Sequence, residues 1–174
     1  MIMADGTSPI VAIVGRSKTG KTTLIEKIIH ELKNRNSNYR IATVKNTLHK
    51  ADFDIPGKDT WRHMQAGSEA TALSSADSIM IIKKKTATDD LQQILKFYNN
   101  DYDLIIVEGY KESNLPKIEV HRKEKGLPLS NLTELLAVAT DEKLDAGVRQ
   151  ISLDDIKGIT DIIEKVIIRQ KNNP

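Results

Sequence analysis

A stretch of eight consecutive residues has the types and spacing of a phosphate-binding loop. Residues 15–22 read GRSKTGKT and match the pattern G-x-x-x-x-G-K-[ST] at every fixed position. In such a loop, successive backbone N–H groups and the start of the following helix face an anion. Lys21 would place positive charge at the outer phosphates, and the hydroxyl of Thr22 can bind Mg²⁺. The motif alone leaves open whether a nucleotide is hydrolysed, donates its phosphate, or is only held.

The remaining positions of the loop also have expected functions. Gly15 and Gly20 permit backbone conformations and close approaches that a Cβ would block. The charges of Arg16 and Lys18 fit either contact with phosphate or a solvated surface position. The further residues that we expect to line the nucleotide site are Arg16, Ser17, Lys18, Thr19 and Thr23.

A carboxylate suited to a nucleotide-bound Mg²⁺ follows another apolar run. Such an ion usually needs an acidic residue at the end of a neighbouring strand. Residues 104–107 read LIIV, and Glu108 and Gly109 follow them. We expect Glu108 to hold Mg²⁺ through water or to orient an attacking water, which makes it, with Lys21, a predicted catalytic residue. The alternative is a carboxylate that only caps the end of a strand.

The segment 46–67, NTLHKADFDIPGKDTWRHMQAG, is rich in titratable and turn residues. After a strand, such a loop could reach the γ-phosphate side of a nucleotide or a second substrate. Its candidate nucleotide-binding residues are His49, Asp54, Lys58 and Asp59. The spacing of its histidines and aspartates matches no closed structural metal site. The alternative is a solvated loop before a capped helix with Asp59 in its first turn.

Alternating apolar runs and amphipathic segments predict the elements that position these residues. We expect strands at 10–14, 41–44, 79–82, 104–107, 117–122, 134–140 and 150–153, and helices at 21–34, 58–70, 88–98 and 154–169. This alternation predicts an α/β, three-layer P-loop NTPase fold with a mainly parallel central sheet. The charged and apolar residues that alternate in 117–122 indicate a more exposed strand.

Right-handed crossovers would bring the loops after 10–14 and 104–107 to one edge of the sheet. The chain length of 174 residues and the lack of a linker predict a single domain over residues 1–174. A common sheet edge within a single domain would place Glu108 beside the phosphate loop.

Composition excludes several classes of protein. A net charge of +2 gives no general attraction to nucleic acid or to an anionic membrane, so neither is an expected partner. The chain has no cysteine, which excludes disulfides and thiolate chemistry. Its apolar runs are too short to span a bilayer, and the start of the chain lacks the pattern of a secretory signal. We therefore expect a cytoplasmic protein.

Together these segments resemble the MobB family, the molybdopterin-guanine dinucleotide biosynthesis adapter proteins. The resemblance spans roughly residues 10–165 and rests on the phosphate loop, VKNTLHKADFDIPGKDTWRHMQAG, LIIVEGYKESNLPKIEVHR and LLAVATDE. It implies a GTP-binding adapter that uses Mg²⁺, has weak GTPase activity and usually acts as a homodimer. Its implied partner is the guanylyltransferase that attaches GMP to the molybdenum cofactor, with molybdopterin itself as a further candidate.

The resemblance also assigns residues. It assigns the binding of phosphate and Mg²⁺ to Gly15, Gly20, Lys21 and Thr22. It places Glu108 on the side of the site where the catalytic metal would bind. The other positions that match family motifs are Lys45, His49, Asp54, Pro56, Gly57, Lys58, Asp59, Lys111, Lys117, His121 and Arg122. The chain departs from the family where Asn46 replaces a histidine that often follows VK.

The choice of base is not settled by any familiar motif, because N-K-x-D is absent. The residues VATDE, 138–142, stand at the end of a predicted strand, where a base-reading loop could lie. Asp141 could accept hydrogen bonds from N1 and N2 of guanine, or it could be the N-cap of a helix. The motifs therefore leave guanine and adenine both open.

Three functions fit these residues. The first is a GTP-binding adapter with slow hydrolysis, since nothing in the chain clearly supplies an attacking-water glutamine or a trans-acting arginine. The second is a small-molecule kinase with residues 111–126 as its lid. The third is a non-catalytic interaction module stabilised by nucleotide. The PGKD match and Glu108 favour the first.

Overall fold

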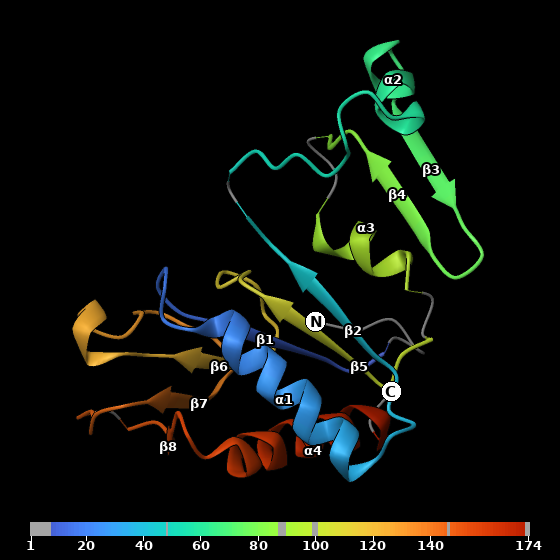
Figure 1. Ribbon diagram of the computed structural model, residues 1–174. Helices are drawn as coiled ribbons and strands as arrows, with labels where there is room; N and C mark the ends of the chain where they lie inside the picture. The colour runs from blue at the N-terminus through green and yellow to red at the C-terminus, as the bar shows by residue number, and fades with distance from the viewer. Residues whose placement is uncertain (1–7, 48, 87–89, 99–100, 146, 173–174) are drawn as a thin grey trace. The chain divides into compact units, whose positions relative to one another are not determined.

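The computed structural model describes residues 8–47, 49–86, 90–98, 101–145 and 147–172 (Figure 1). Residues 1–7, which belong to the start of the chain examined above for a secretory signal, lie outside this part. The chain divides into two compact units, one formed by residues 1–46 and 98–174 and the other by residues 47–97. The single domain expected over residues 1–174 stays a prediction. In the described part of the chain, no helix has the length and apolar character needed to cross a membrane.

The first unit is built on a six-stranded sheet in which all neighbouring strands are parallel. The strands are β1 (Ile10–Val14), β2 (Ile41–Lys45), β5 (Leu104–Glu108), β6 (Lys117–Val120), β7 (Leu135–Thr140) and β8 (Gln150–Ser152), in the order β2-β5-β1-β6-β7-β8. This arrangement confirms the predicted α/β fold with a mainly parallel central sheet. Because β1 and β5 are parallel neighbours, the loops that follow them emerge at the same edge of the sheet, as expected.

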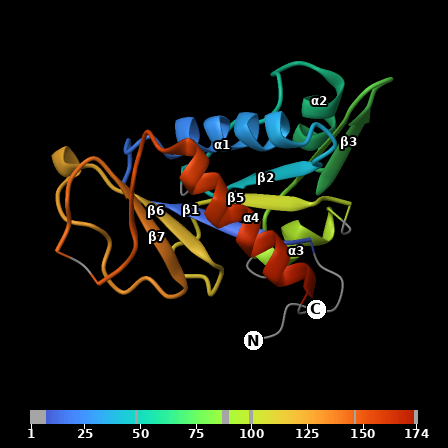
Figure 2. The same ribbon diagram turned by 90° about the horizontal axis from the view of Figure 1, so that it is seen from below.

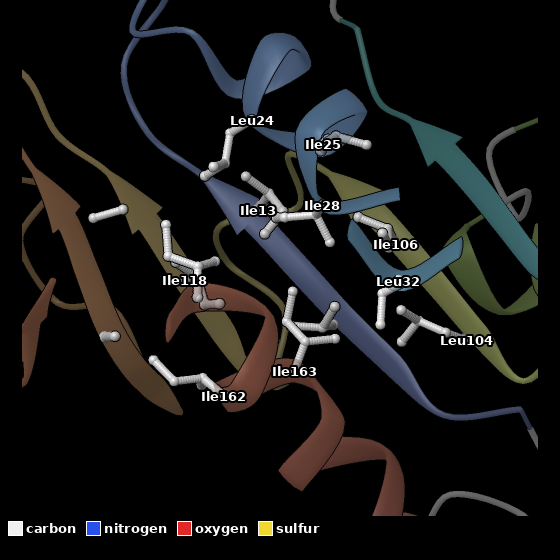
Figure 3. Packing of buried hydrophobic residues seen from close by; sticks show 14 of the residues in the cluster. Ile13, Leu24, Ile25, Ile28, Leu32, Leu104, Ile106, Ile118, Ile162 and Ile163 are labelled. Atoms are coloured by element: carbon white, nitrogen blue, oxygen red, sulfur yellow. The ribbon is translucent and has the colours of Figure 1, made fainter. Parts of the chain in front are cut away.

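Helices α1 (Lys21–Arg35) and α4 (Ile156–Asn172) pack against one face of this sheet, and α4 crosses it in Figure 2. Apolar side chains at helical spacing on α1 belong to the buried core: Leu24 and Ile28 lie near Ile13 of β1, and Leu32 lies near Leu104 of β5 (Figure 3). Burying each such side chain contributes about 1.5–3 kcal/mol relative to leaving it in water. This packing fixes the direction in which α1 leaves the phosphate loop.

The strand β6 differs from its prediction. It ends at Val120 rather than at residue 122, and all of it is buried between β1 and β7 instead of being exposed. Ile118 and Val120 belong to the core cluster, whereas Lys117 and Glu119 alternate with them along the strand and are also buried. Lys117 is accommodated because its Nζ donates hydrogen bonds to backbone carbonyl groups. The alternation therefore reflects two buried faces, one apolar and one polar.

The second unit contains α2 (Asp59–Gln65), β3 (Ala70–Ser74), β4 (Ile79–Lys83) and α3 (Leu91–Lys96). The helix expected over 58–70 ends at Gln65, because Gly67 follows with a φ of 110°. Strand β3 was not predicted, since it is largely exposed and lacks an apolar run. The strand expected at 79–82 exists, but it pairs antiparallel with β3 in a separate two-stranded sheet.

The remaining helices differ from their predictions only at their ends. The helix expected over 88–98 corresponds to α3, and residues 88 and 89 lie outside the described part of the chain. The last predicted helix, 154–169, corresponds to α4.

Candidate functional site

The predicted phosphate loop connects the buried strand β1 directly to α1. Gly15 has a φ of 146°, and a Cβ built on it would lie only 2.4 Å from the carbonyl oxygen of Val120. Gly20 precedes the helix with a φ of 94° and supplies no side-chain cap. The first N–H groups of α1 are therefore not satisfied by a capping side chain, which is the arrangement that suits an anion.

Lys21 turns back over the loop. Its Nζ donates to the carbonyl oxygens of Gly15 at 3.1 Å and Arg16 at 2.7 Å. Burial lowers the pKa of Lys21, an effect that the carboxylate of Glu108 opposes and the ammonium of Lys45 reinforces. The ammonium of Lys21 therefore interacts electrostatically with both Glu108 and Lys45, which end the neighbouring strands.

Glu108 lies beside the phosphate loop, where the sequence placed it. One of its oxygens, Oε2, accepts a hydrogen bond from Thr22 Oγ1 at 3.0 Å, across 86 positions of sequence. Its other oxygen, Oε1, lies 3.0 Å from Lys45 Nζ. A hydroxyl and a carboxylate are oxygen ligands of the kind that Mg²⁺ prefers, so Thr22 and Glu108 fit such an ion.

Lys45 is the residue of this cluster to which sequence reasoning assigned no chemistry. It ends β2 and is the cross-strand neighbour of Glu108, and its Nζ also lies 3.4 Å from Thr22 Oγ1. The signal that could have found it is its position, because it ends an apolar strand as Glu108 does. Only the resemblance to family motifs had marked it.

The other side chains of the loop point to different surroundings. Arg16 is exposed, which agrees with a surface position, and its Nε donates to the carbonyl oxygen of Leu127 at 2.9 Å; its contact with phosphate stays a prediction. The hydroxyl of Thr19 is buried within the loop, where it donates to the carbonyl oxygen of Arg16. Ser17, Lys18 and Thr23 are also exposed, and their contact with nucleotide stays a prediction.

Asp141 lies at the carboxyl end of β7 and accepts two hydrogen bonds. The donors are the backbone N–H of Lys123 at 2.9 Å and Arg122 Nη1 at 3.3 Å. The N–H of Lys123 is the main cause that lowers the pKa of Asp141, and Arg122 adds to it. The N-cap alternative is wrong, because within the described residues the next helix, α4, begins only at Ile156.

Arg122 connects Asp141 to the phosphate loop, since its Nε donates to the carbonyl oxygen of Thr19 at 3.0 Å. Its neighbour His121 is buried, with Nε2 lying 2.9 Å from Glu142 Oε1. Of the motif residues around β6, Lys117 and His121 are thus enclosed, and Arg122 is the one that reaches the loop. Lys111 is exposed and lies near Glu112.

His49, Asp54, Lys58 and Asp59 belong to the second unit. Asp59 lies in the first turn of α2, as expected, and Asp54 accepts a hydrogen bond from the backbone N–H of Ile55. The predicted contact of these four residues with nucleotide stays a prediction. Over the part of the chain that the structure describes, no group of three or more histidine or acidic residues could hold a metal ion.

Comparison with known proteins identifies the family. The family model for molybdopterin guanine dinucleotide synthesis protein B, MobB, matches residues 10–141. The molybdopterin-guanine dinucleotide biosynthesis adapter protein of Haemophilus influenzae is 34% identical over 166 residues, which are 94% of this chain and 92% of that protein. The adapter protein of the same description from Escherichia coli is 31% identical over 168 residues, with coverages of 93% and 95%.

A solved structure agrees with the sequence matches. The crystal structure of molybdopterin-guanine biosynthesis protein B superimposes with a TM-score of 0.74 at 29% identity, covering 91% of this chain and 99% of that one. Because the family model spans most of the chain and these relatives match nearly end to end, the chain belongs to the MobB family.

Proposed function

We propose that this protein binds GTP together with Mg²⁺ at residues 15–23, hydrolyses it slowly, and serves as an adapter in molybdopterin-guanine dinucleotide biosynthesis. The observation that carries the proposal is the contact between Thr22 and Glu108, which places two Mg²⁺-type ligands beside the phosphate loop. The names of the relatives support the pathway, since they are described as adapter proteins of molybdopterin-guanine dinucleotide biosynthesis.

Different groups of the site would bind different parts of a nucleoside triphosphate with its Mg²⁺. Backbone N–H groups of the loop and of the first turn of α1 would hold the phosphate oxygens. The ammonium of Lys21 would exchange its two loop carbonyls for phosphate, a stronger acceptor because it is charged. Thr22 and Glu108 would hold Mg²⁺, which supplies neutralisation of the phosphate charge when bound.

Slow hydrolysis is expected from the state of Glu108. Its carboxylate is assigned to Mg²⁺ together with Thr22, and it is then not free to orient an attacking water as well. A partner that rearranges this cluster would accelerate turnover. We propose that the partner is the guanylyltransferase that attaches GMP to molybdopterin, and that the adapter acts as a cytoplasmic homodimer.

Preference for guanine is proposed to reside at Asp141. Its carboxylate stands at the carboxyl end of the sheet and is connected to the phosphate loop through Arg122. A carboxylate matches the paired donors of guanine N1 and N2, which adenine lacks. We expect Asp141→Asn to reduce the ratio of GTP to ATP affinity, and an unchanged ratio would reject this assignment.

The decisive experiment measures nucleotide affinity directly. Fluorescent GTP and ATP analogues are titrated with Mg²⁺ present, and turnover of the protein alone is followed by phosphate release. Lys21→Ala is expected to weaken GTP binding by about a hundredfold, the loss of a strong charge-assisted contact. Lys27→Ala removes the same charge from an exposed position on α1 and should leave affinity unchanged.

Each alternative function predicts a different result. Rapid phosphate transfer to an added small-molecule acceptor would favour the kinase. Absence of specific nucleotide binding would favour the interaction module. Retained GTP affinity in Lys21→Ala would reject the phosphate loop as the binding site.

A further inference from the structure

Lys45 occupies the position in the first unit where a bound cation would be expected. Its Nζ lies 3.0 Å from Glu108 Oε1 and 3.4 Å from Thr22 Oγ1, and Thr22 Oγ1 itself donates to the second carboxylate oxygen. The ammonium thus contacts both residues that fit Mg²⁺. The Glu108 side chain is only 12% exposed, whereas that of Lys45 is 60% exposed and so has room to move.

An ammonium and a Mg²⁺ ion cannot share these ligands. Both are compact cations, and at a separation of about 4 Å like charges repel strongly even in a partly solvated site. Mg²⁺ would also need the carboxylate oxygen that now accepts from Lys45. Entry of the ion therefore requires the lysine side chain to leave, which its flexible four-carbon stem permits.

We propose that Lys45 is a built-in placeholder for Mg²⁺: its ammonium neutralises Glu108 while the site is empty and is displaced when Mg²⁺ enters with nucleotide. This inference rests on the proposed function, because it assigns Mg²⁺ to the same two residues. Once displaced, the ammonium is free to pair with phosphate oxygens, so Lys45 becomes a second phosphate-binding lysine beside Lys21.

The charges around Glu108 predict that nucleotide and metal bind together. Two ammonium groups, Lys21 and Lys45, lie near one carboxylate, and the charge of Lys45 contributes to the lowered pKa of Lys21. This net positive charge attracts a polyanion and opposes a free divalent cation. The placeholder thus couples metal affinity to nucleotide binding.

The simpler alternative is a pair of cross-strand neighbours with no relation to metal. The same two strands provide a comparison, because Arg40 Nε lies 3.9 Å from Asp103 Oδ2 at their opposite ends. Arg40→Met therefore removes one positive charge from the same strand pair without touching Thr22 or Glu108. It is the matched control for Lys45→Met, since each variant loses one positive charge and one ion pair with a carboxylate.

The experiment titrates the nucleotide-free chain of 174 residues with Mn²⁺, a probe for Mg²⁺ sites, and follows the free ion by electron paramagnetic resonance. We expect Lys45→Met to bind Mn²⁺ about tenfold more tightly than the wild type, and Arg40→Met to match the wild type. A second titration measures GTP affinity in the presence of a chelator. Without Mg²⁺ and without the Lys45 ammonium, the charge of Glu108 repels the triphosphate, so Lys45→Met is expected to bind GTP about tenfold more weakly than Arg40→Met.

The results separate this inference from the proposed function. Equal Mn²⁺ affinity in Lys45→Met and Arg40→Met would overturn the placeholder, whether or not GTP binds. Failure of the wild type to bind GTP at all, with tighter Mn²⁺ binding in Lys45→Met, would leave the placeholder standing and reject the GTP proposal. Thermal unfolding of each variant, followed by circular dichroism, confirms that the compared proteins are folded, and Lys45→Gln repeats the test with a polar side chain.

Discussion

Replacing Gly15 by alanine tests how closely the phosphate loop packs on β6. A Cβ at this position would lie 2.4 Å from the carbonyl oxygen of Val120 and 3.1 Å from Thr19 Oγ1. Carbon–oxygen contacts ordinarily begin near 3.3 Å, so the loop and the strand would have to separate by about 0.9 Å. Val120 is part of the buried core, and such a displacement therefore reaches the packing beneath the loop.

Gly20 provides the matched variant in the same loop. Its φ of 94° is also unfavourable for alanine, but the nearest atom to a new Cβ is Arg122 Nη2 at 3.7 Å, an ordinary contact. Backbone strain alone costs about 1–3 kcal/mol, and forcing apart packed backbone adds about 1–3 kcal/mol more. We therefore expect Gly20→Ala to lower the free energy of unfolding by about 2 kcal/mol and Gly15→Ala by about 4 kcal/mol.

Thermal unfolding followed by far-ultraviolet circular dichroism measures both losses. The fluorescence of Trp61 is unsuitable, because this residue lies in the second unit and not in the sheet that carries the loop. At about 3 °C per kcal/mol for a chain of this size, Tm should fall by about 6 °C for Gly20→Ala and about 12 °C for Gly15→Ala. Equal losses in the two variants, or a Gly15→Ala protein as stable as the wild type, would refute the packing argument.

Two further predictions concern the buried charges of β6. Burial raises the pKa of Glu119 above its ordinary value of 4.5. Between 4.5 and the raised pKa, the folded protein keeps a proton that the unfolded chain loses. The free energy of unfolding therefore falls as pH rises from 4.5 through the raised pKa. Glu119→Gln keeps an acceptor for the N–H of Leu129 and should flatten this fall when urea midpoints at pH 5 and pH 8 are compared; an unaltered pH dependence would contradict the explanation. Lys117→Met leaves the carbonyls of Leu115 and Thr133 without their ammonium donor, and each unsatisfied carbonyl costs about 1–3 kcal/mol of stability. The urea midpoint of this variant should therefore fall well below that of the wild type. An unchanged midpoint would show that these hydrogen bonds contribute little.

The parts of the site that could be predicted from sequence are those fixed by neighbouring residues and by parallel-strand geometry. The phosphate loop needs only a strand, eight residues of motif and a helix, all contiguous between Ile10 and Arg35. Glu108 needs one further rule, that parallel strands end at a common edge of the sheet. Its contact with Thr22 follows from that rule, although 86 positions separate the two residues.

The parts that could not be predicted depend on strand order and on burial. Arg122 reaches the carbonyl oxygen of Thr19 because β6 lies beside β1, an order that periodicity does not encode. Lys117 and Glu119 were expected to face water because charge usually marks exposure, yet backbone groups of the covering segments satisfy Lys117 and one oxygen of Glu119. Position along the chain therefore predicted the loop, and tertiary contacts decided its surroundings.

The cations around the phosphate loop share one property that bears on how nucleotide binds. Lys21 is held by two loop carbonyls, Lys45 by Glu108, Arg16 by the carbonyl of Leu127, and Arg122 by Thr19 and Asp141. A phosphate that recruits any of them must replace a bond that is already made, and hydrogen bonds to charged groups each contribute about 1.5–3 kcal/mol. Under the proposed function, each cation therefore contributes less than its full bond to phosphate, and backbone N–H groups and Mg²⁺ would supply the rest of the affinity. Cations that already have partners within the protein therefore agree with the proposed function, in which nucleotide would bind reversibly under the control of a partner rather than turn over rapidly.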